Sequence, residues 1–201
     1  MNIDSNSAVI CTYGNPILRK RAQKVTRFNS SLANKAKEML RKMYIANGIG
    51  LAAPQAGELI QLIVIDLQQK DNNDPVTLDD RTVPLTLIQP LVLVNPSYTP
   101  LSDIQDAKEE GCLSLPNARG TVKRFFEISL DYQDLEGQLH TLRCNDLLAR
   151  CIQHECDHLN GVLFIDHLSK AERREQQACL NDIKALGGQV DYRDNLMAPE
   201  A

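Results

Sequence analysis

The chain lacks the features that mark membrane proteins, disulfide-rich secreted proteins and nucleic-acid-binding proteins. No apolar run approaches the ~20 residues that a membrane-spanning helix needs. The first residues contain neither a basic stretch nor an apolar one, so we expect no secretory signal, and they lack the arginines of a transit peptide. The formal net charge of −4 gives no bulk attraction to nucleic acid or to an anionic membrane.

The six cysteines contain no CxxC pair, and a chain of 201 residues can form a hydrophobic core without disulfides. With 43% hydrophobic and 24% charged residues, the composition is that of an ordinary soluble globular protein. We therefore expect mostly buried free thiols and a reducing, cytoplasmic location.

Apolar periodicity predicts short strands between one leading helix and two trailing helices. Residues 30–46 follow the helical period, and Asn47-Gly48 supplies a left-handed stop. Alternating or β-branched segments predict strands at residues 59–67, 91–94, 126–132 and 138–143. Because regular βαβ alternation is missing, the expected class is α+β: small antiparallel or mixed sheets packed around a central helix, with an N-terminal and a C-terminal helix.

No internal repeat or second domain is evident, so we expect a single domain over residues 1–201 with a core at about 10–170. A capping box at Ser169 begins a C-terminal helix expected at about 169–187, followed by a loose tail, 188–201. Two further segments are expected to be irregular, a small-residue stretch at 48–55 and a polar surface loop or insertion at 68–90.

Residues 153–158, Gln-His-Glu-Cys-Asp-His, contain an HExxH motif on a helix expected at about 146–160. Residues four apart lie on one helix face, so His154 and His158 can direct two imidazoles at one point. Glu155 lies on the buried stripe beside them, where an uncompensated carboxylate costs several kcal/mol or becomes protonated. A bound divalent cation removes this difficulty, and the motif therefore indicates a metal site.

A third ligand is available in Cys112, which lies upstream in the sequence Glu-Gly-Cys-Leu-Ser. One thiolate and two neutral imidazoles suit zinc or ferrous iron and leave one position open for water. Taken alone, a cysteine is more often a buried thiol, and Gln55, which follows a proline, is by default a surface residue. His140 and His167 show no comparable arrangement and are expected at the surface or at an edge.

Three separated segments together resemble the signature motifs of the peptide deformylases, in the family's order. They are GIGLAAPQ at 48–55, EGCLS at 110–114 and QHECDHL at 153–159. The resemblance extends from about residue 13 to residue 169. The chain departs from the family in holding Asp146 where glycine is frequent, and in having a long 68–90 segment.

The resemblance implies hydrolysis of the N-formyl group from nascent chains that begin with formyl-methionine, with release of formate. It implies that Glu155 takes a proton from the attacking water and passes it to the leaving amine. The side-chain amide of Gln55 and the backbone N–H of Leu113 are implied to stabilise the negative charge that develops on the formyl oxygen. The implied metal ligands are Cys112, His154 and His158.

By the same resemblance, the substrate peptide lies extended along residues 48–50 and bonds backbone to backbone. The methionine side chain enters an apolar pocket with Arg150 near the rim, while Arg119 contacts the substrate backbone. For both arginines, a solvated or structural charge is an equal alternative. The implied substrate-binding residues are Gly48, Ile49, Gly50, Glu110, Arg119, Leu147, Arg150 and Cys151.

The donor set accepts zinc, iron, nickel or cobalt, and the resemblance favours one ferrous ion as the native metal. The implied partners are formyl-methionyl nascent peptides and the ribosome near its exit tunnel, with no membrane and no direct nucleic-acid signal. The C-terminal helix mixes acidic and basic residues, which disfavours a ribosome dock through that helix.

Two alternatives use the same motif. A zinc endopeptidase also combines HExxH with a water and a glutamate base, but Cys112 has no role in it and no further ligand stands in the expected setting. A catalytically silent metal-binding or redox-sensing relative would keep the ligands and lose the base, whereas Glu155 and Gln55 are both present.

Overall fold

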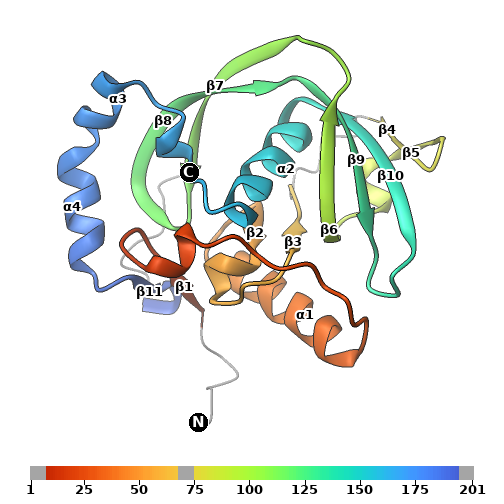
Figure 1. Cartoon of the computed structure of the whole chain (residues 1–201), viewed down its shortest axis with the longest axis horizontal. Coiled ribbons are helices and arrows are strands. Elements are labelled where there is room, and N and C mark those ends of the chain that lie inside the picture. The colour runs from red at the N-terminus through yellow and green to blue at the C-terminus, as the bar shows by residue number, and fades with distance from the viewer. Residues whose placement is uncertain (1–7, 68–74, 195–201) are drawn as a thin grey trace.

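The computed structural model describes residues 8–67 and 75–194, and a seven-stranded antiparallel sheet lies at its centre (Figure 1). The strand order in this sheet is β2-β3-β6-β9-β10-β4-β5. Two separate ribbons, β1–β11 and β7–β8, complete the strands of the described residues. The bounds of the central strands are β2 Gly50–Ala52, β3 Leu62–Ile65, β4 Pro75–Leu78, β5 Arg81–Pro84, β6 Leu91–Pro100, β9 Glu127–Gln133 and β10 Leu139–Asn145.

Two helices pack on this sheet through their apolar faces. Helix α1 (Ser30–Ile45) is capped by Asn29, whose side chain accepts a hydrogen bond from Leu32 N–H, and it packs on β2 and β3. Helix α2 (Asp146–Leu159) lies in the middle of the molecule, in contact with the sheet and with β8 (Figure 1). None of the helices in the described ranges is long and apolar enough to cross a membrane.

A long hairpin, β7 (Gln105–Cys112) with β8 (Leu115–Phe125), arches over α2 (Figure 1). Its two-residue turn, Leu113-Ser114, lies directly after Cys112, because Cys112 pairs with Leu115. The hairpin therefore brings Cys112, from the EGCLS segment, close to helix α2, although the HExxH motif on α2 follows Cys112 by more than 40 residues in the sequence.

The predicted α+β class is confirmed, with α2 as the central HExxH helix. The helix expected at 30–46 is α1, and the strands expected at 126–132 and 138–143 are β9 and β10. These elements have strong local patterns of period 3.6 or 2, and their packing agrees with those patterns.

Several expected boundaries of helices and strands are wrong, because pairing and packing between distant segments set where these elements begin and end. Residues 48–55, expected to be irregular, form β2 and a 3-10 helix (Ala53–Ala56), since β2 pairs along β3. The strand expected at 91–94 continues to Pro100 through a bulge at Asn95, which adopts a φ of 52°. The C-terminal helix is divided at Gln176 into α3 (Lys170–Glu175) and α4 (Gln177–Ala185).

The segments expected to be a loop and a tail are also partly regular. In the expected 68–90 loop, β4 and β5 form a hairpin on β10, and Asp79 and Asp80 make its turn with φ of 48° and 62°. In the expected loose tail, β11 (Gln189–Asp191) pairs with β1 (Val9–Cys11). Residues 68–74 and 195–201 lie outside the described residues.

Candidate metal centre and reaction site

Helix α2 places two imidazoles side by side, as the HExxH spacing predicts. The rings of His154 and His158 have centroids 5.0 Å apart and meet edge to face. Ile152, Leu148 and Leu159 anchor the helix in the sheet core, so the histidine face is turned toward the β7–β8 hairpin. Burial lowers the pKa of His158, which favours the neutral imidazole that a metal ion requires.

Cys112 meets the two histidines from the end of β7. Its Sγ lies 3.2 Å from Nε2 of His158, and the ligand atoms of Cys112, His154 and His158 all lie within 4.8 Å of one another. Metal–sulfur and metal–nitrogen bonds of about 2.3 and 2.1 Å place the ligand atoms of a tetrahedral ion about 3.5 Å apart. The three side chains therefore fit one divalent ion, and their one sulfur and two nitrogens suit zinc or ferrous iron.

Glu155 lies beside this cluster with one oxygen unused. The residue is 3% exposed, and its Oε2 has no hydrogen-bond partner among the described residues. Burial raises the pKa of Glu155 to about 7. A Cβ on Gly50 would lie 2.6 Å from Oε1 of Glu155, so β2 can pass this carboxylate only because position 50 is glycine. A buried, unsatisfied carboxylate of this kind is suited to accept a proton.

Gln55 presents its amide nitrogen to the same place. Its Oε1 accepts a hydrogen bond of 2.8 Å from Ala52 N–H, which fixes the orientation of the amide group. Its Nε2 then donates to Ser114 Oγ at 3.2 Å and lies 3.5 Å from Cys112 Sγ. The backbone N–H of Leu113 has no acceptor among the described residues, and Leu113 is one of the residues that line the same cavity. Leu113, which follows Cys112, and the Gln55 amide nitrogen, which bonds to Ser114 Oγ and Cys112 Sγ, thus both lie near the metal cluster.

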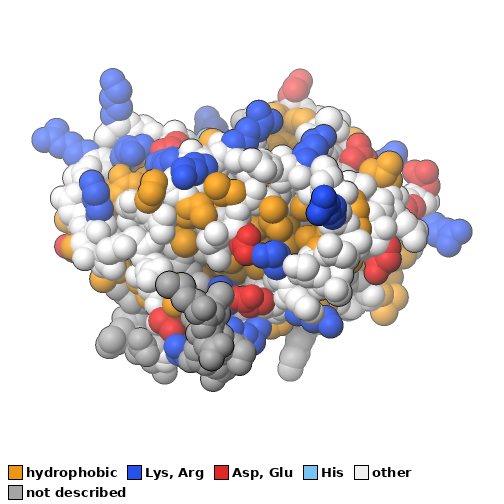
Figure 2. Space-filling model, turned by 60° about the horizontal axis from the view of Figure 1, so that its bottom comes forward, with side chains coloured by type: hydrophobic (Ala, Val, Ile, Leu, Met, Phe, Trp, Pro, Cys, Tyr) orange, Lys and Arg blue, Asp and Glu red, His pale blue; other side chains and the backbone are white. Residues whose placement is uncertain are grey.

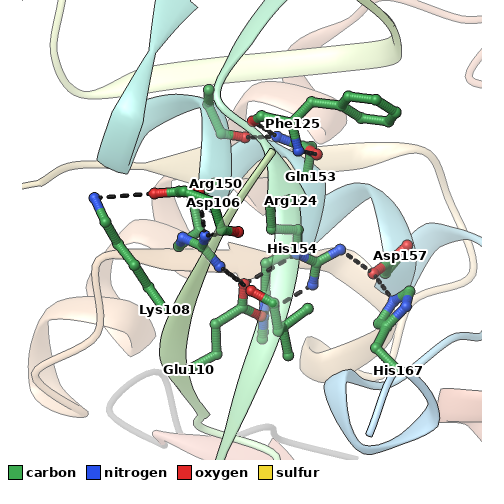
Figure 3. A network of polar contacts seen from close by, with 12 residues as sticks. Asp106, Lys108, Glu110, Arg124, Phe125, Arg150, Gln153, His154, Asp157 and His167 are labelled. Atoms are coloured by element: carbon green, nitrogen blue, oxygen red, sulfur yellow. Dashed lines mark hydrogen bonds and ion pairs between the residues drawn. The ribbon is translucent and has the colours of Figure 1, made fainter. Parts of the chain in front are cut away.

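A buried network of charges contacts His154 (Figure 3). Glu110 accepts a hydrogen bond of 2.9 Å from Nδ1 of His154, two of 2.9 and 3.0 Å from Arg124 and one of 2.8 Å from Arg150. Burial alone would raise the pKa of Glu110, but the hydrogen bonds from His154 and Arg124 hold it well below its usual range. Because the ionised carboxylate accepts the hydrogen bond from Nδ1 of His154, the other ring nitrogen, Nε2, is free to bind the metal.

The network continues to the surface in two directions (Figure 3). On one side, Arg150 pairs with Asp106 at 2.5 Å, and Lys108 bridges Asp106 to Asp146 at the start of α2. On the other side, Arg124 pairs with Asp157 at 2.5 Å, and Asp157 contacts His167. The hairpin and the metal helix are therefore joined by ion pairs as well as by apolar packing.

A cavity of about 280 Å³ opens in front of the metal cluster. All of the sequence-predicted substrate-binding residues line it, together with Glu155, Gln55, Cys112, His154 and Leu113. His158 is not part of the lining and is 1% exposed. Others in the lining are Asn47, Glu109, Gly111, Pro116 and Tyr192.

Two of the predicted substrate contacts have other partners. Arg150, expected near the rim, is 5% exposed and bonded to Glu110, Asp106 and the carbonyl of Val122. This corrects its expected position, because the paired charges draw the guanidinium under β7. The carboxylate of Glu110 is likewise occupied, and its contacts favour holding His154 over binding substrate.

Sequence reasoning missed Ser114, Arg124, Asp157 and Tyr192. Ser114 lies within the EGCLS segment, so the motif itself could have indicated a role for Ser114, which accepts a hydrogen bond from Gln55. The partners of Arg124 depend on the β7–β8 register, which the sequence does not show. Tyr192 lies in the segment expected to be a loose tail, and no sequence motif there indicates that it reaches the site.

The chain is similar to known proteins over most of its length. The profile of the family described as polypeptide deformylase matches residues 7–174. A peptide deformylase of Opitutus terrae is 48% identical over 179 residues, which make up 88% of this chain and 91% of the relative. A peptide deformylase of Synechococcus elongatus, solved in complex with actinonin, is 37% identical with a TM-score of 0.69, covering 88% of this chain and 84% of that one. Peptide deformylase 1B of Arabidopsis thaliana is 30% identical with a TM-score of 0.74, covering 95% and 96%.

Proposed function

This chain belongs to the peptide deformylase family, and from that membership we propose how its own residues carry out the family's reaction. The reaction is the metal-dependent hydrolysis of the N-formyl group from the N-terminal formyl-methionine of newly made proteins, with release of formate. The observation that supports this assignment best is the cluster of Cys112, His154 and His158 beside Glu155, next to a cavity.

Cys112, His154 and His158 hold one divalent ion, with Fe²⁺ as the native metal and Zn²⁺, Ni²⁺ or Co²⁺ as substitutes. The sulfur ligand and the two imidazoles support iron or zinc equally on chemistry, and the family resemblance favours iron. When bound, such an ion supplies Lewis acidity that polarises the formyl group and makes a water nucleophilic near neutral pH. Glu110 holds the His154 ring in place from behind.

Glu155 is the general base. Its free oxygen faces no partner among the described residues, so it can accept the proton of the water that attacks the formyl carbon. The same carboxyl group then gives this proton to the departing amine of methionine. Because the bond broken is the formyl C–N bond, the products are formate and a peptide with a free amino group.

Gln55 and Leu113 stabilise the oxygen that becomes negative during the attack. The Ala52 N–H fixes the Gln55 amide so that its NH₂ group faces the metal cluster. The N–H of Leu113 is the second donor, and one such donor is typically worth about 3 kcal/mol of transition-state stabilisation.

The substrate binds along the cavity. Its backbone pairs with residues 48–50, and its methionine side chain lies against Ile49, Leu147 and Cys151, which supply apolar walls. Arg119, which lines the same cavity, contacts the peptide backbone. Recognition through backbone bonds suits an enzyme that acts on many different nascent chains.

We also propose a cytoplasmic location and work near the ribosomal exit tunnel, where formylated chains emerge. All six cysteines are free thiols, as a reducing compartment allows. Basic and acidic side chains both occur on the face drawn in Figure 2, so nothing there resembles a uniformly basic dock. Sedimentation of the protein with ribosomes tests this part.

The function is tested by anaerobic purification, metal analysis and a formate-release assay on formyl-Met-Ala-Ser. We expect about one metal ion per chain and formate release that stops after chelation. Cleavage of an internal peptide bond without formate would instead identify a zinc endopeptidase. Bound metal with no hydrolysis of either kind would identify a silent metal-binding relative.

A further inference from the structure

The C-terminal segment reaches the reaction site, although it follows the part of the chain that matches the family profile. That match ends at residue 174. Beyond α4, strand β11 pairs antiparallel with β1, with Asp191 opposite Val9. This pairing brings the next residue, Tyr192, to the cavity wall, where it is 5% exposed.

Tyr192 makes one polar contact there, with the turn of the β7–β8 hairpin. Its hydroxyl donates a hydrogen bond of 2.6 Å to the carbonyl oxygen of Leu113. Burial raises the pKa of the Tyr192 hydroxyl well above its usual range, so the group keeps its proton and stays a donor. A short bond to a buried carbonyl restricts the orientation of that peptide group.

The peptide group between Leu113 and Ser114 is held at both ends. Tyr192 holds its carbonyl oxygen, and its N–H, from Ser114, lies 3.4 Å from Cys112 Sγ. The Leu113 N–H belongs to the adjoining peptide group, joined to this one only through the Cα of Leu113. Fixing one peptide plane therefore limits how the neighbouring N–H can turn, and that N–H has no other partner among the described residues.

We propose that Tyr192 is a positioning residue for the hydrolysis, which aims the Leu113 N–H at the reacting oxygen through its bond to the Leu113 carbonyl. This proposal rests on the role of the Leu113 N–H given under the proposed function. A donor aimed in advance is worth more than a free one, because it needs no reorientation when the charge develops. The C-terminal segment, which lies beyond the residues that the family profile matches, thereby helps to position this donor.

The test compares Y192F, which removes only the hydroxyl, with D191A as a matched control. Asp191 holds the same segment through Ala8 N–H at 3.3 Å but does not contact the hairpin turn. In zinc- or nickel-loaded enzyme we expect Y192F to lower kcat about tenfold with KM within twofold of the unaltered protein, as expected when a transition-state contact is lost. D191A should change both constants less than twofold.

A readout independent of activity is the amide NMR signal of Ser114 in ¹⁵N-labelled protein. Y192F should move this signal and speed its hydrogen exchange, because its peptide group loses one of two anchors, and D191A should leave it in place. If Y192F does not fold or bind metal, 3-fluorotyrosine placed at position 192 keeps the ring and strengthens the donor, and it should shift the same signal.

Unchanged kcat and an unmoved Ser114 signal in Y192F would overturn the proposal, and so would an equal loss of kcat in D191A, which would indicate general tethering. If the unaltered protein releases no formate, the proposed function fails. The amide signal would still report whether Tyr192 holds the hairpin turn.

Discussion

Replacing Glu110 with glutamine removes the charge at the centre of the buried network and keeps the shape of the side chain. The carboxylate accepts bonds from Arg124, Arg150 and His154. An amide offers one oxygen and turns an NH₂ group toward the remaining donors. Breaking a buried ion pair by removing one partner costs about 3–5 kcal/mol. At about 2–4 °C per kcal/mol for a chain of this size, Tm should fall by about 6–20 °C.

The same substitution also removes the acceptor that orients the imidazole of His154. Loss of such a partner typically lowers metal affinity about 10–100-fold. Competition for zinc against a chromophoric chelator measures the affinity, and circular dichroism of zinc-free protein measures Tm. E109Q is the matched control, since Glu109 is the exposed neighbour on β7 and has no ion pair within the described ranges. Its effect on unfolding should stay within about 0.5 kcal/mol. If E110Q matches E109Q in both measurements, the positioning role of Glu110 is refuted.

Three further predictions address the base, the sulfur ligand and a surface histidine. E155A should keep its metal and lose about 10²–10⁴-fold in formate release, since it removes only the proton acceptor; substantial turnover would take Glu155 out of the mechanism. C112S should bind ferrous iron more weakly, because a hydroxyl replaces a thiolate, and equal occupancy by elemental analysis would contradict this. His140 lies 2.7 Å from Asp79 and 3.3 Å from Asp134, and the hydrogen bond to Asp79, with that to Asp134, raises its pKa. Its protonation therefore stabilises the fold at low pH, and this is lost as pH rises through the raised pKa. H140Q should cost about 0.5–1 kcal/mol near pH 5.5 and less near pH 9; an equal cost in urea unfolding at both would contradict the assignment.

The sequence predicts the chemical centre better than its surroundings. His154 and His158 are four residues apart on one helix, so their meeting follows from helix geometry alone. Cys112 could be assigned because its neighbours resemble a known motif. The bonds of Arg124 and Arg150 to Glu110 depend instead on the β7–β8 register and on how α2 packs beneath it, and neither has a local signature.

The same reason explains the errors in the fold. Strand β11 exists because it pairs with β1 at the other end of the chain. Its three residues are too few for an alternating apolar pattern to predict a strand from the sequence. Asn95 and Pro96 read as the end of a strand, yet the side chain of Asn95 bonds to Val25 and Gln133 and holds a bulge within β6. Non-local contacts decided these elements, and they also brought Tyr192 to the site.

The central claim is that one metal ion is held by the sulfur of Cys112 and by one nitrogen each from His154 and His158. X-ray absorption spectroscopy at the metal edge of zinc- or iron-loaded protein tests it directly. The zinc spectrum should show one sulfur neighbour at about 2.3 Å and nitrogen or oxygen neighbours at about 2.0–2.1 Å, with the sulfur missing in C112S. A spectrum without sulfur in the unaltered protein, or one that C112S leaves unchanged, would contradict the account.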